Sequence, residues 1–301
     1  MVQTGQISAD NLDVFMPLIP GILQAQALDE EGFRFYGISV DDEAAGIIVI
    51  RERADTADLR FMYLLPERRR MGYMDQALST VLFDLHREGF TRVIVNYVPS
   101  EYESVAHICD RFSFVKHKTD RAFFRFRVAQ IRKCKAVTYV PQGIVRLRAL
   151  PDGIKQELYK RVDTRGYDIS HIIKKTDLRN NVEERSLVYM EGDKPMGLML
   201  VQDMKSLHDG DKSGAFGIVF PDGASADIAL IYIGSTQVKA PLYLVSALAR
   251  DILTVYEENE FITGYFPESH LTKLLEGTLG IQAMREITGE FMLDSLESYY
   301  E

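Results

Sequence analysis

Three consecutive arginines, Arg68, Arg69 and Arg70, stand just before Gly72 at the predicted start of a helix. The N-terminal end of a helix carries partial positive charge and unpaired N–H groups, so cations there are disfavoured unless an anion is bound. A glycine lets the main chain approach such an anion closely, because it has no Cβ. The stretch PERRRMGYM, residues 66–74, therefore predicts an anion-binding site.

The elements around this stretch alternate between helical and extended periodicity. Behind the arginines, Met74, Ala77, Leu78, Val81, Leu82 and Leu85 recur at helical spacing and predict a helix with one apolar face. In chain order the first half predicts a helix over 10–26, a hairpin over 33–52, a strand over 57–65, the helix just described, a strand over 92–98, a helix over 105–112 and a strand over 122–128. This order indicates a mixed α and β domain.

The second half of the chain repeats the same order, with short sequence matches on corresponding elements. The matches are Ala57-Asp58-Leu59 with Ala226-Asp227-Ile228, Tyr97-Val98-Pro99 with Tyr265-Phe266-Pro267, and Gly46-Ile47-Ile48 with Gly197-Leu198-Met199. Three matches in the same order favour an internal duplication. We expect the boundary near residue 138, which gives domains over 1–138 and 139–301.

Composition excludes several classes of protein. The 301 residues are 46% hydrophobic and 26% charged, as in an ordinary folded protein, and no apolar run approaches the length of a membrane span. Residues 1–140 hold 18 Lys and Arg against 19 Asp and Glu, while residues 141–301 hold 17 against 25. The acidic second half argues against nucleic-acid binding there. Two cysteines without a CxxC pattern, and histidines without metal-ligand spacing, predict a reduced, cytoplasmic protein with no metal.

In this strand–loop–helix setting, RRMGYM at 69–74 resembles the [RQ]xxGx[GA] signature of the GNAT N-acetyltransferase superfamily. ICDRFSF at 108–114 resembles the LYEKLGF pattern of the same family. The resemblance spans most of residues 30–128, and the repeat joins the rest of the chain to it. It implies an α+β fold of two GNAT-like domains in tandem, each a mostly antiparallel mixed sheet flanked by helices.

The resemblance also implies where acyl-coenzyme A would bind. The arm of the coenzyme would lie along Met62, Tyr63 and Leu64, with the N–H of Leu64 as a candidate donor to the oxyanion. The diphosphate would lie at the loop and helix start, Arg68, Arg69, Arg70, Met71, Gly72, Tyr73 and Met74. Acetyl-CoA is expected as a co-substrate, and a helix N-terminus is a suitable place for its phosphates. Met74 departs from the family signature, which has Gly or Ala there, and either crowds the phosphates or turns into the core.

Four residues are candidates for proton transfer by the same resemblance. Asp58 stands where some family members carry a carboxylate base, and its alternative is a surface carboxylate at a strand end. Cys109 stands where the family often has the tyrosine that protonates the leaving thiolate, and Tyr97 and Tyr102 are alternative acids. Each of these three has a structural alternative in core or rim packing.

The second copy departs from the signature at the helix start. It reads QVKAPL, with Gln237 aligned to Arg69 and Ala240 to Gly72, and Pro241 has no N–H to offer a phosphate. We therefore expect a degenerate second domain that binds no coenzyme.

Together these features predict an N-acyltransferase that moves an acetyl or other acyl group from acetyl-CoA to an amine of a small molecule or peptide. The alternative is a non-catalytic acyl-CoA-binding sensor or structural subunit. A paired-domain transferase acting with tRNA is a third possibility, which the acidic charge disfavours. No nucleic-acid or membrane partner is expected, and the sequence does not indicate the acceptor or the oligomeric state.

Overall fold

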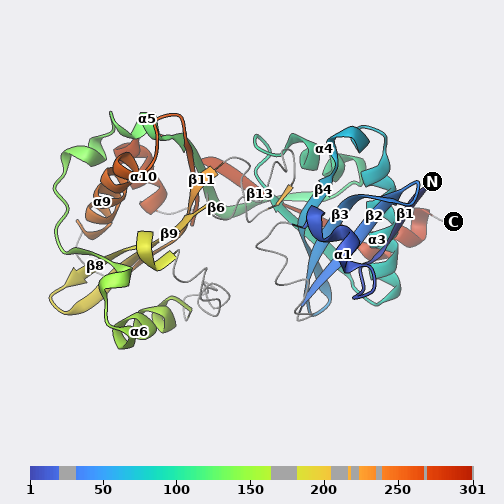
Figure 1. Cartoon of the computed structure of the whole chain (residues 1–301), viewed down its shortest axis with the longest axis horizontal. Helices are drawn as coiled ribbons and strands as arrows, with labels where there is room; N and C mark the ends of the chain where they lie inside the picture. Colours follow the sequence, from blue (N-terminus) through green and yellow to red (C-terminus); the bar gives the residue numbers. More distant parts are fainter. Residues whose placement is uncertain are drawn as a thin grey trace. The chain divides into compact units, whose positions relative to one another are not determined.

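The computed structural model describes residues 1–19, 32–163, 182–204, 216–217, 224–234, 239–267 and 270–299. The chain divides into two compact units (Figure 1). The first unit comprises Met1–Thr119, Leu207–Asp222 and Arg285–Glu301, and the second comprises Asp120–Ser206 and Gly223–Met284.

A mixed sheet forms the centre of the first unit. Its strands in spatial order are β1 (Val2–Gln6), β2 (Phe33–Val40), β3 (Glu43–Arg53), β4 (Thr56–Leu64), β5 (Arg92–Tyr97), β13 (Met284–Met292) and the first part of β6 (Val115–Arg127). All neighbouring pairs from β1 to β4 and the pair of β5 with β13 are antiparallel, whereas β4 and β5 are parallel. The predicted hairpin and the two predicted strands after it are therefore confirmed.

Helices cover both faces of this sheet. The apolar side of α3 (Tyr73–Arg87) buries Ala77, Leu78, Val81, Leu82 and Leu85, and packs in one core with α4 (Glu103–Arg111). On the opposite face α1 (Leu12–Phe15) and a 3-10 turn at Met16–Leu18 pack over β2, β3 and β4. The helix predicted over 10–26 is thus short, since Pro17 stands at the start of the 3-10 turn, and its second half lies outside the described residues.

The second unit repeats this architecture. Its strands in spatial order are the second part of β6, then β12 (Phe261–Pro267), β11 (Ala224–Ile233), β9 (Lys194–Asp203), β8 (Leu187–Glu191) and β7 (Ile144–Arg146). The helices α5 (Val128–Ile131), α9 (Ala240–Val255) and α10 (His270–Leu279) contribute to a core on one face of the sheet, and α6 (Asp152–Asp163) precedes β8.

Strand register supports the internal duplication more strongly than the short sequence matches do. Gly46 pairs with Leu64 in the first unit, and Gly197 pairs with Ile233 in the second. The ladder between β3 and β4 skips one residue of β4 at position 60, and the ladder between β9 and β11 skips one residue of β11 at position 229. Both skipped positions are β-bulges that lie 169 residues apart, which is also the offset between Ala57-Asp58-Leu59 and Ala226-Asp227-Ile228.

A close contact explains the repeated glycine in the first unit. A Cβ at Gly46 would lie 2.5 Å from the carbonyl oxygen of Tyr63 on the neighbouring strand, where no side chain fits. Glycine at this position allows β3 to approach β4 just before the loop that holds the arginines.

The last strands of the two sequence repeats are exchanged between the units. β13, from the C-terminal repeat, pairs with β5 of the first unit, while residues 121–127 of β6, from the N-terminal repeat, pair with β12 of the second. The compact units therefore do not coincide with the linear segments 1–138 and 139–301. That division describes the two sequence repeats and stays a prediction.

Candidate functional site

The parallel strands β4 and β5 separate partway along their length. They pair at Thr56, Ala57 and Asp58, and the ladder ends there. Beyond this point the two-residue strand β10 (Phe216–Gly217) pairs with β4 at Phe61 and Met62. The opposite edge of β4 is held by β3 along the whole strand, and the N–H of Leu65 donates to the carbonyl oxygen of Ala45 at 2.9 Å. Because N–H groups alternate in direction along a strand, the N–H of Leu64 points to the edge that faces away from β3.

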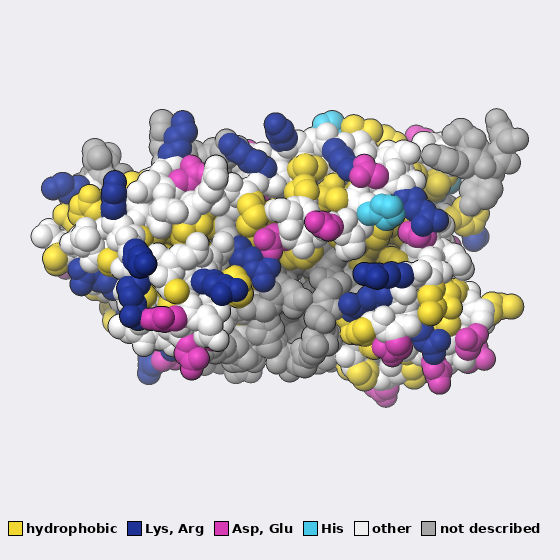
Figure 2. Space-filling model, turned by 90° about the horizontal axis from the view of Figure 1, so that it is seen from above, with side chains coloured by type: hydrophobic (Ala, Val, Ile, Leu, Met, Phe, Trp, Pro, Cys, Tyr) yellow, Lys and Arg dark blue, Asp and Glu magenta, His cyan; other side chains and the backbone are white. Residues whose placement is uncertain are grey.

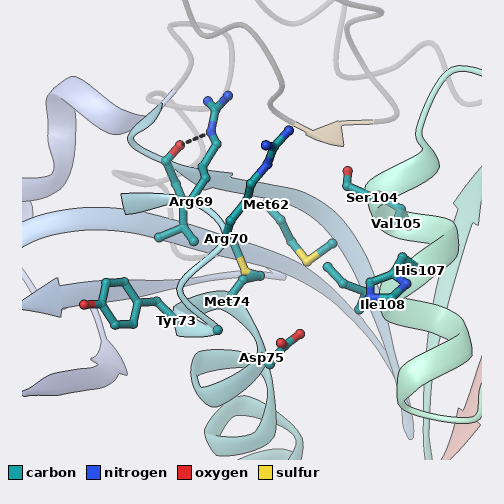
Figure 3. A pocket seen from close by; sticks show the side chains of 12 residues that line it. Met62, Arg69, Arg70, Tyr73, Met74, Asp75, Ser104, Val105, His107 and Ile108 are labelled. Atoms are coloured by element: carbon teal, nitrogen blue, oxygen red, sulfur yellow. Dashed lines mark hydrogen bonds between the residues drawn. The ribbon is translucent and has the colours of Figure 1, made fainter. Parts of the chain in front are cut away.

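A cavity of about 320 Å³ lies between this part of β4, the start of α3 and the helix α4 (Figure 3). Its lining comes from three segments: Met62 and Leu64 on β4; Arg69, Arg70, Gly72, Tyr73, Met74 and Asp75 on the loop and first turn of α3; and Ser104, Val105, His107 and Ile108 on α4. The volume is at the lower end of the range for small-molecule sites.

The backbone at the N-terminal end of α3 is suited to binding an anion. Gly72 is the N-cap of the helix, in the left-handed region at φ 76°, and no side chain caps the first turn. A Cβ added at Gly72 would meet no atom within 4 Å, so the main chain is open on that side. The first N–H groups of a helix have no partner within it, and here they lie at the edge of the cavity.

The three arginines occupy different places. Arg69 lines the cavity, its Nε donates to the carbonyl oxygen of Leu64 at 2.9 Å, and its guanidinium lies 5.6 Å from the centre of the Tyr63 ring. Arg70 also lines the cavity and has a positive φ of 61°, whereas Arg68 forms an ion pair with Glu43 at 3.0 Å. Arg69 and Arg70 are therefore the two cationic side chains that this loop presents to the cavity.

Seven of the ten residues predicted for the coenzyme site line the cavity. The other three are Tyr63, whose side chain packs on the opposite face of β4 beside α1, Arg68, and Met71, which is 56% exposed. Met74 lines the cavity and also packs against the core under α3, so its side chain forms part of an apolar floor. The roles of these residues toward a ligand stay predictions.

None of the four residues predicted for proton transfer lines this cavity. Tyr97 and Cys109 are each 1% exposed, and Tyr102 is 7% exposed, within the core under α3 and α4. Burial raises the pKa of Cys109 to about 11 and raises the pKa of Tyr97, which interacts with the Cys109 thiol. A Cβ at Gly289 of β13 would lie 3.2 Å from the Cys109 sulfur, so the thiol packs against the exchanged strand.

Asp58 is a buried carboxylate beside two arginines. It is 1% exposed, and its carboxylate lies 3.2 Å from Arg60 and 3.6 Å from Arg53. Its neighbours Ala57 and Leu59 face the core under α3, so strand alternation directs Asp58 to the opposite face of the sheet. Its surroundings indicate a structural ion pair, and its assignment as a base stays a prediction.

Among the residues that the structure describes, the equivalent carboxylate of the second unit, Asp227, forms no such ion pair. It accepts a hydrogen bond of 2.7 Å from the hydroxyl of Thr263, which is its direct neighbour on β12. Although the residue as a whole keeps some exposure, desolvation of the carboxyl raises its pKa to about 6, with Thr263 and Arg121 opposing the shift. A carboxyl with a raised pKa in the folded state stabilises the fold below its unfolded pKa, and this contribution is lost as pH rises through about 6.

Replacing Asp227 with asparagine is therefore expected to stabilise the protein at neutral pH but not in acid. Asparagine keeps an oxygen for the Thr263 hydroxyl and removes the buried charge. The gain in unfolding free energy is expected to appear between about pH 4 and pH 6 and to be at most about 3 kcal/mol above that range. Chemical denaturation of both proteins at pH 4, 5, 6 and 7.5 measures it; a gain that does not depend on pH would contradict this account.

Four residues on α4 line the cavity although none was predicted for the site from the sequence, and two of them are polar. Ser104 and His107 are exposed and one helical turn apart. Neither belongs to a motif, and an isolated histidine on a helix gives no signal of its own. Ser104 and His107 are three residues apart, on the side of the helix opposite the apolar Val105 and Cys109. This spacing in the sequence indicates that they share a solvent-facing side of the helix.

The corresponding helix of the second unit begins differently. The N-cap of α9 is Lys239, in the right-handed helical region at φ −86°, and Pro241 follows in the first turn. Ala240, aligned with Gly72, is fully buried. The side chain thus packs into the core at the position where the first unit has an open main chain. Gln237, aligned with Arg69, lies outside the described residues.

On the face of the molecule that Figure 2 shows, positive and negative side chains do not form separate patches. Lys and Arg side chains are interspersed with Asp and Glu across it. Among the helices that the structure describes, none is both long and apolar enough to span a membrane.

Comparisons with known proteins give a family match for part of the first unit. Residues 8–107 match the model of the Acetyltransferase (GNAT) family. No curated protein gives a significant match. Among solved structures, a tandem GNAT protein from the clavulanic acid biosynthesis pathway aligns with a TM-score of 0.61 at 12% identity, covering 97% of this chain and 99% of that one. A GCN5-related N-acetyltransferase from Sphaerobacter thermophilus aligns with a TM-score of 0.56 at 12% identity, covering 97% and 96%.

Residues 8–107, about a third of the chain, thus match the GNAT acetyltransferase family, and the chain as a whole has the fold of tandem GNAT proteins. The expected α+β architecture of two GNAT-like domains is confirmed. At this level of identity the structural likeness establishes the fold, and the reaction must be argued from the site.

Proposed function

We propose that this protein is an N-acyltransferase that takes an acetyl group from acetyl-CoA and transfers it to an amine of a small molecule or peptide. The observation that carries the proposal is the cavity at the start of α3, where open main chain at Gly72 meets Arg69 and Arg70. A diphosphate fits that combination of N–H groups and guanidinium groups. The family match over the same residues supports acyl transfer in general.

The residues present suit acyl-coenzyme A along the whole cavity. Met62, Leu64 and Val105 offer an apolar path for a flexible arm, and the N–H of Leu64 remains the candidate donor to a carbonyl oxygen that gains charge. When bound, the coenzyme supplies the activated acyl group. The chain itself would bind the phosphates, align the thioester beside β4 and exclude water with the apolar lining.

We further propose that only the first unit binds coenzyme. Pro241 removes one N–H from the first turn of α9, and the buried Ala240 replaces the open glycine. The C-terminal sequence repeat would then act by completing the fold, since it supplies β13 to the sheet of the first unit.

A non-catalytic acyl-CoA sensor is the second candidate function. It is favoured by one observation, namely that Tyr97, Tyr102 and Cys109 are buried away from the cavity. Release of coenzyme thiol from acetyl-CoA separates the two functions, measured with spermidine, kanamycin and a lysine-containing peptide as acceptors. Thiol release that requires one of these amines supports the transferase. Binding of acetyl-CoA without amine-dependent release across the three would instead favour the sensor.

A further inference from the structure

One side of α4 faces the cavity and continues beyond it. Ser104, His107, Ile108 and Arg111 follow one another at helical spacing, so they share a side of the helix. The first three line the cavity. Arg111, in the last turn, forms an ion pair with Asp75, the third residue of α3.

This ion pair joins the two helices at one point along the cavity. One turn before Arg111 on α4 lies His107, and one turn before Asp75 lies the N-cap Gly72. Each residue of a helix advances about 1.5 Å along the axis, so His107 lies roughly 6 Å and Gly72 roughly 4.5 Å from the ion pair along their own helices. Figure 3 shows His107 on the side of α4 that faces Met74 and Asp75, across the cavity from the start of α3.

The chemistry of imidazole suits this place. Protonated histidine donates from both ring nitrogens and carries a positive charge, whereas the main-chain N–H groups opposite it are neutral donors. A phosphate group held at Gly72 would thus have donors on one side and, across the cavity, a side chain that can add a charge. Ser104, one turn earlier, offers a hydroxyl on the same wall.

We infer that His107 is a phosphate-binding residue that closes the anion site from the α4 side and helps to set the affinity for the coenzyme. This inference rests on the proposed function, because the phosphate is that of acyl-coenzyme A. His107 would contact a phosphate oxygen, either of the diphosphate or of the 3′-phosphate of the coenzyme.

The sign of the pH dependence follows from the charges around His107. The charged groups on the elements packed against it are Asp75 on α3, Arg69 and Arg70 on the preceding loop, and Glu103, Asp110 and Arg111 on α4. Carboxyl and guanidinium groups ordinarily keep their charge between about pH 6 and pH 8.5, whereas imidazole does not. Loss of the imidazole proton weakens phosphate binding as pH rises, while ionisation of the 3′-phosphate strengthens it over the same range. Ionisation of the 3′-phosphate affects the variant and the wild type alike. The ratio of their affinities at each pH therefore reports the contribution of the His107 side chain alone.

The test compares His107→Gln with His117→Gln by calorimetric titration of acetyl-CoA and of dephospho-CoA at pH 6 and pH 8.5. His117 is an exposed histidine on β6 outside the cavity lining, which makes it a matched control. His107→Gln is expected to weaken acetyl-CoA binding about tenfold at pH 6 and less than about threefold at pH 8.5, as for loss of a charge-assisted hydrogen bond. His117→Gln is expected to bind as the wild type does.

Each outcome has a distinct meaning. If the loss persists with dephospho-CoA, His107 contacts the diphosphate; if it disappears, His107 contacts the 3′-phosphate, and both results support the inference. Equal affinity of His107→Gln and wild type at pH 6 would overturn it, as would a loss of the same size at both pH values. Failure of the wild type to bind acetyl-CoA would overturn the proposed function itself, and this inference with it.

Discussion

Replacing Gly72 with valine is expected to weaken acetyl-CoA binding by at least about 100-fold. The residue has φ 76°, a conformation that a β-branched residue rarely adopts; it lines the cavity, and an added Cβ would meet no atom within 4 Å. Valine would add two methyl groups where the diphosphate is proposed to lie. Calorimetric titration of the folded variant with acetyl-CoA measures the loss.

A matched control separates the loss of binding from backbone strain. Gly89, at the other end of α3, has φ 88° and equally open surroundings. Gly89→Val and Gly72→Val are each expected to lower the unfolding free energy by about 1–3 kcal/mol, since both force a branched residue into the left-handed region. Only Gly72→Val should lose the coenzyme. Equal affinity of the two variants would contradict a phosphate site at Gly72.

Replacing Asp58 with alanine is expected to destabilise the fold by about 3–5 kcal/mol, because it leaves Arg60 without its buried partner. Arg60 is largely desolvated, which lowers its pKa, and the nearby Asp58 carboxylate is the main opposing influence. Urea denaturation at neutral pH measures the change. The double variant Asp58→Leu/Arg60→Met is expected to recover much of the lost unfolding free energy, because no buried charge is left without a partner.

An exposed ion pair provides the comparison for Asp58. Glu43 and Arg68 lie 3.0 Å apart, but the Glu43 side chain is 76% exposed. Glu43→Ala is expected to cost less than about 1 kcal/mol, as for other surface pairs. A loss at Asp58 no larger than that at Glu43 would contradict the structural assignment. A fully stable Asp58→Asn protein that binds acetyl-CoA but has lost turnover would instead support the catalytic base.

The parts of the fold that sequence predicted are those set by local pattern. The strand over 57–65 and the helix after it are visible because their apolar residues repeat with the period of each element. Gly72 was found because a glycine before a helix has a conformational meaning that depends only on its neighbours. The two bulges, in contrast, were not predicted from the sequence and became visible only in the strand pairing.

The exchange of β13 and β6 was not predictable, because strand pairing between segments far apart in the chain leaves no local signature. β6 begins at Val115 rather than near residue 122, since its first residues are polar and do not read as a strand. The surroundings of Asp58 and Cys109 were missed for a related reason. Residue type at an aligned position indicates what chemistry is possible, whereas burial and partners depend on the other strands.

The most direct test of the central claim is the stoichiometry of acetyl-CoA binding to the full chain, measured by isothermal titration calorimetry. We expect one site per chain, which Gly72→Val removes and Ala240→Gly in the second unit leaves unchanged. No binding by the wild-type chain, or two equivalent sites per chain, would contradict it.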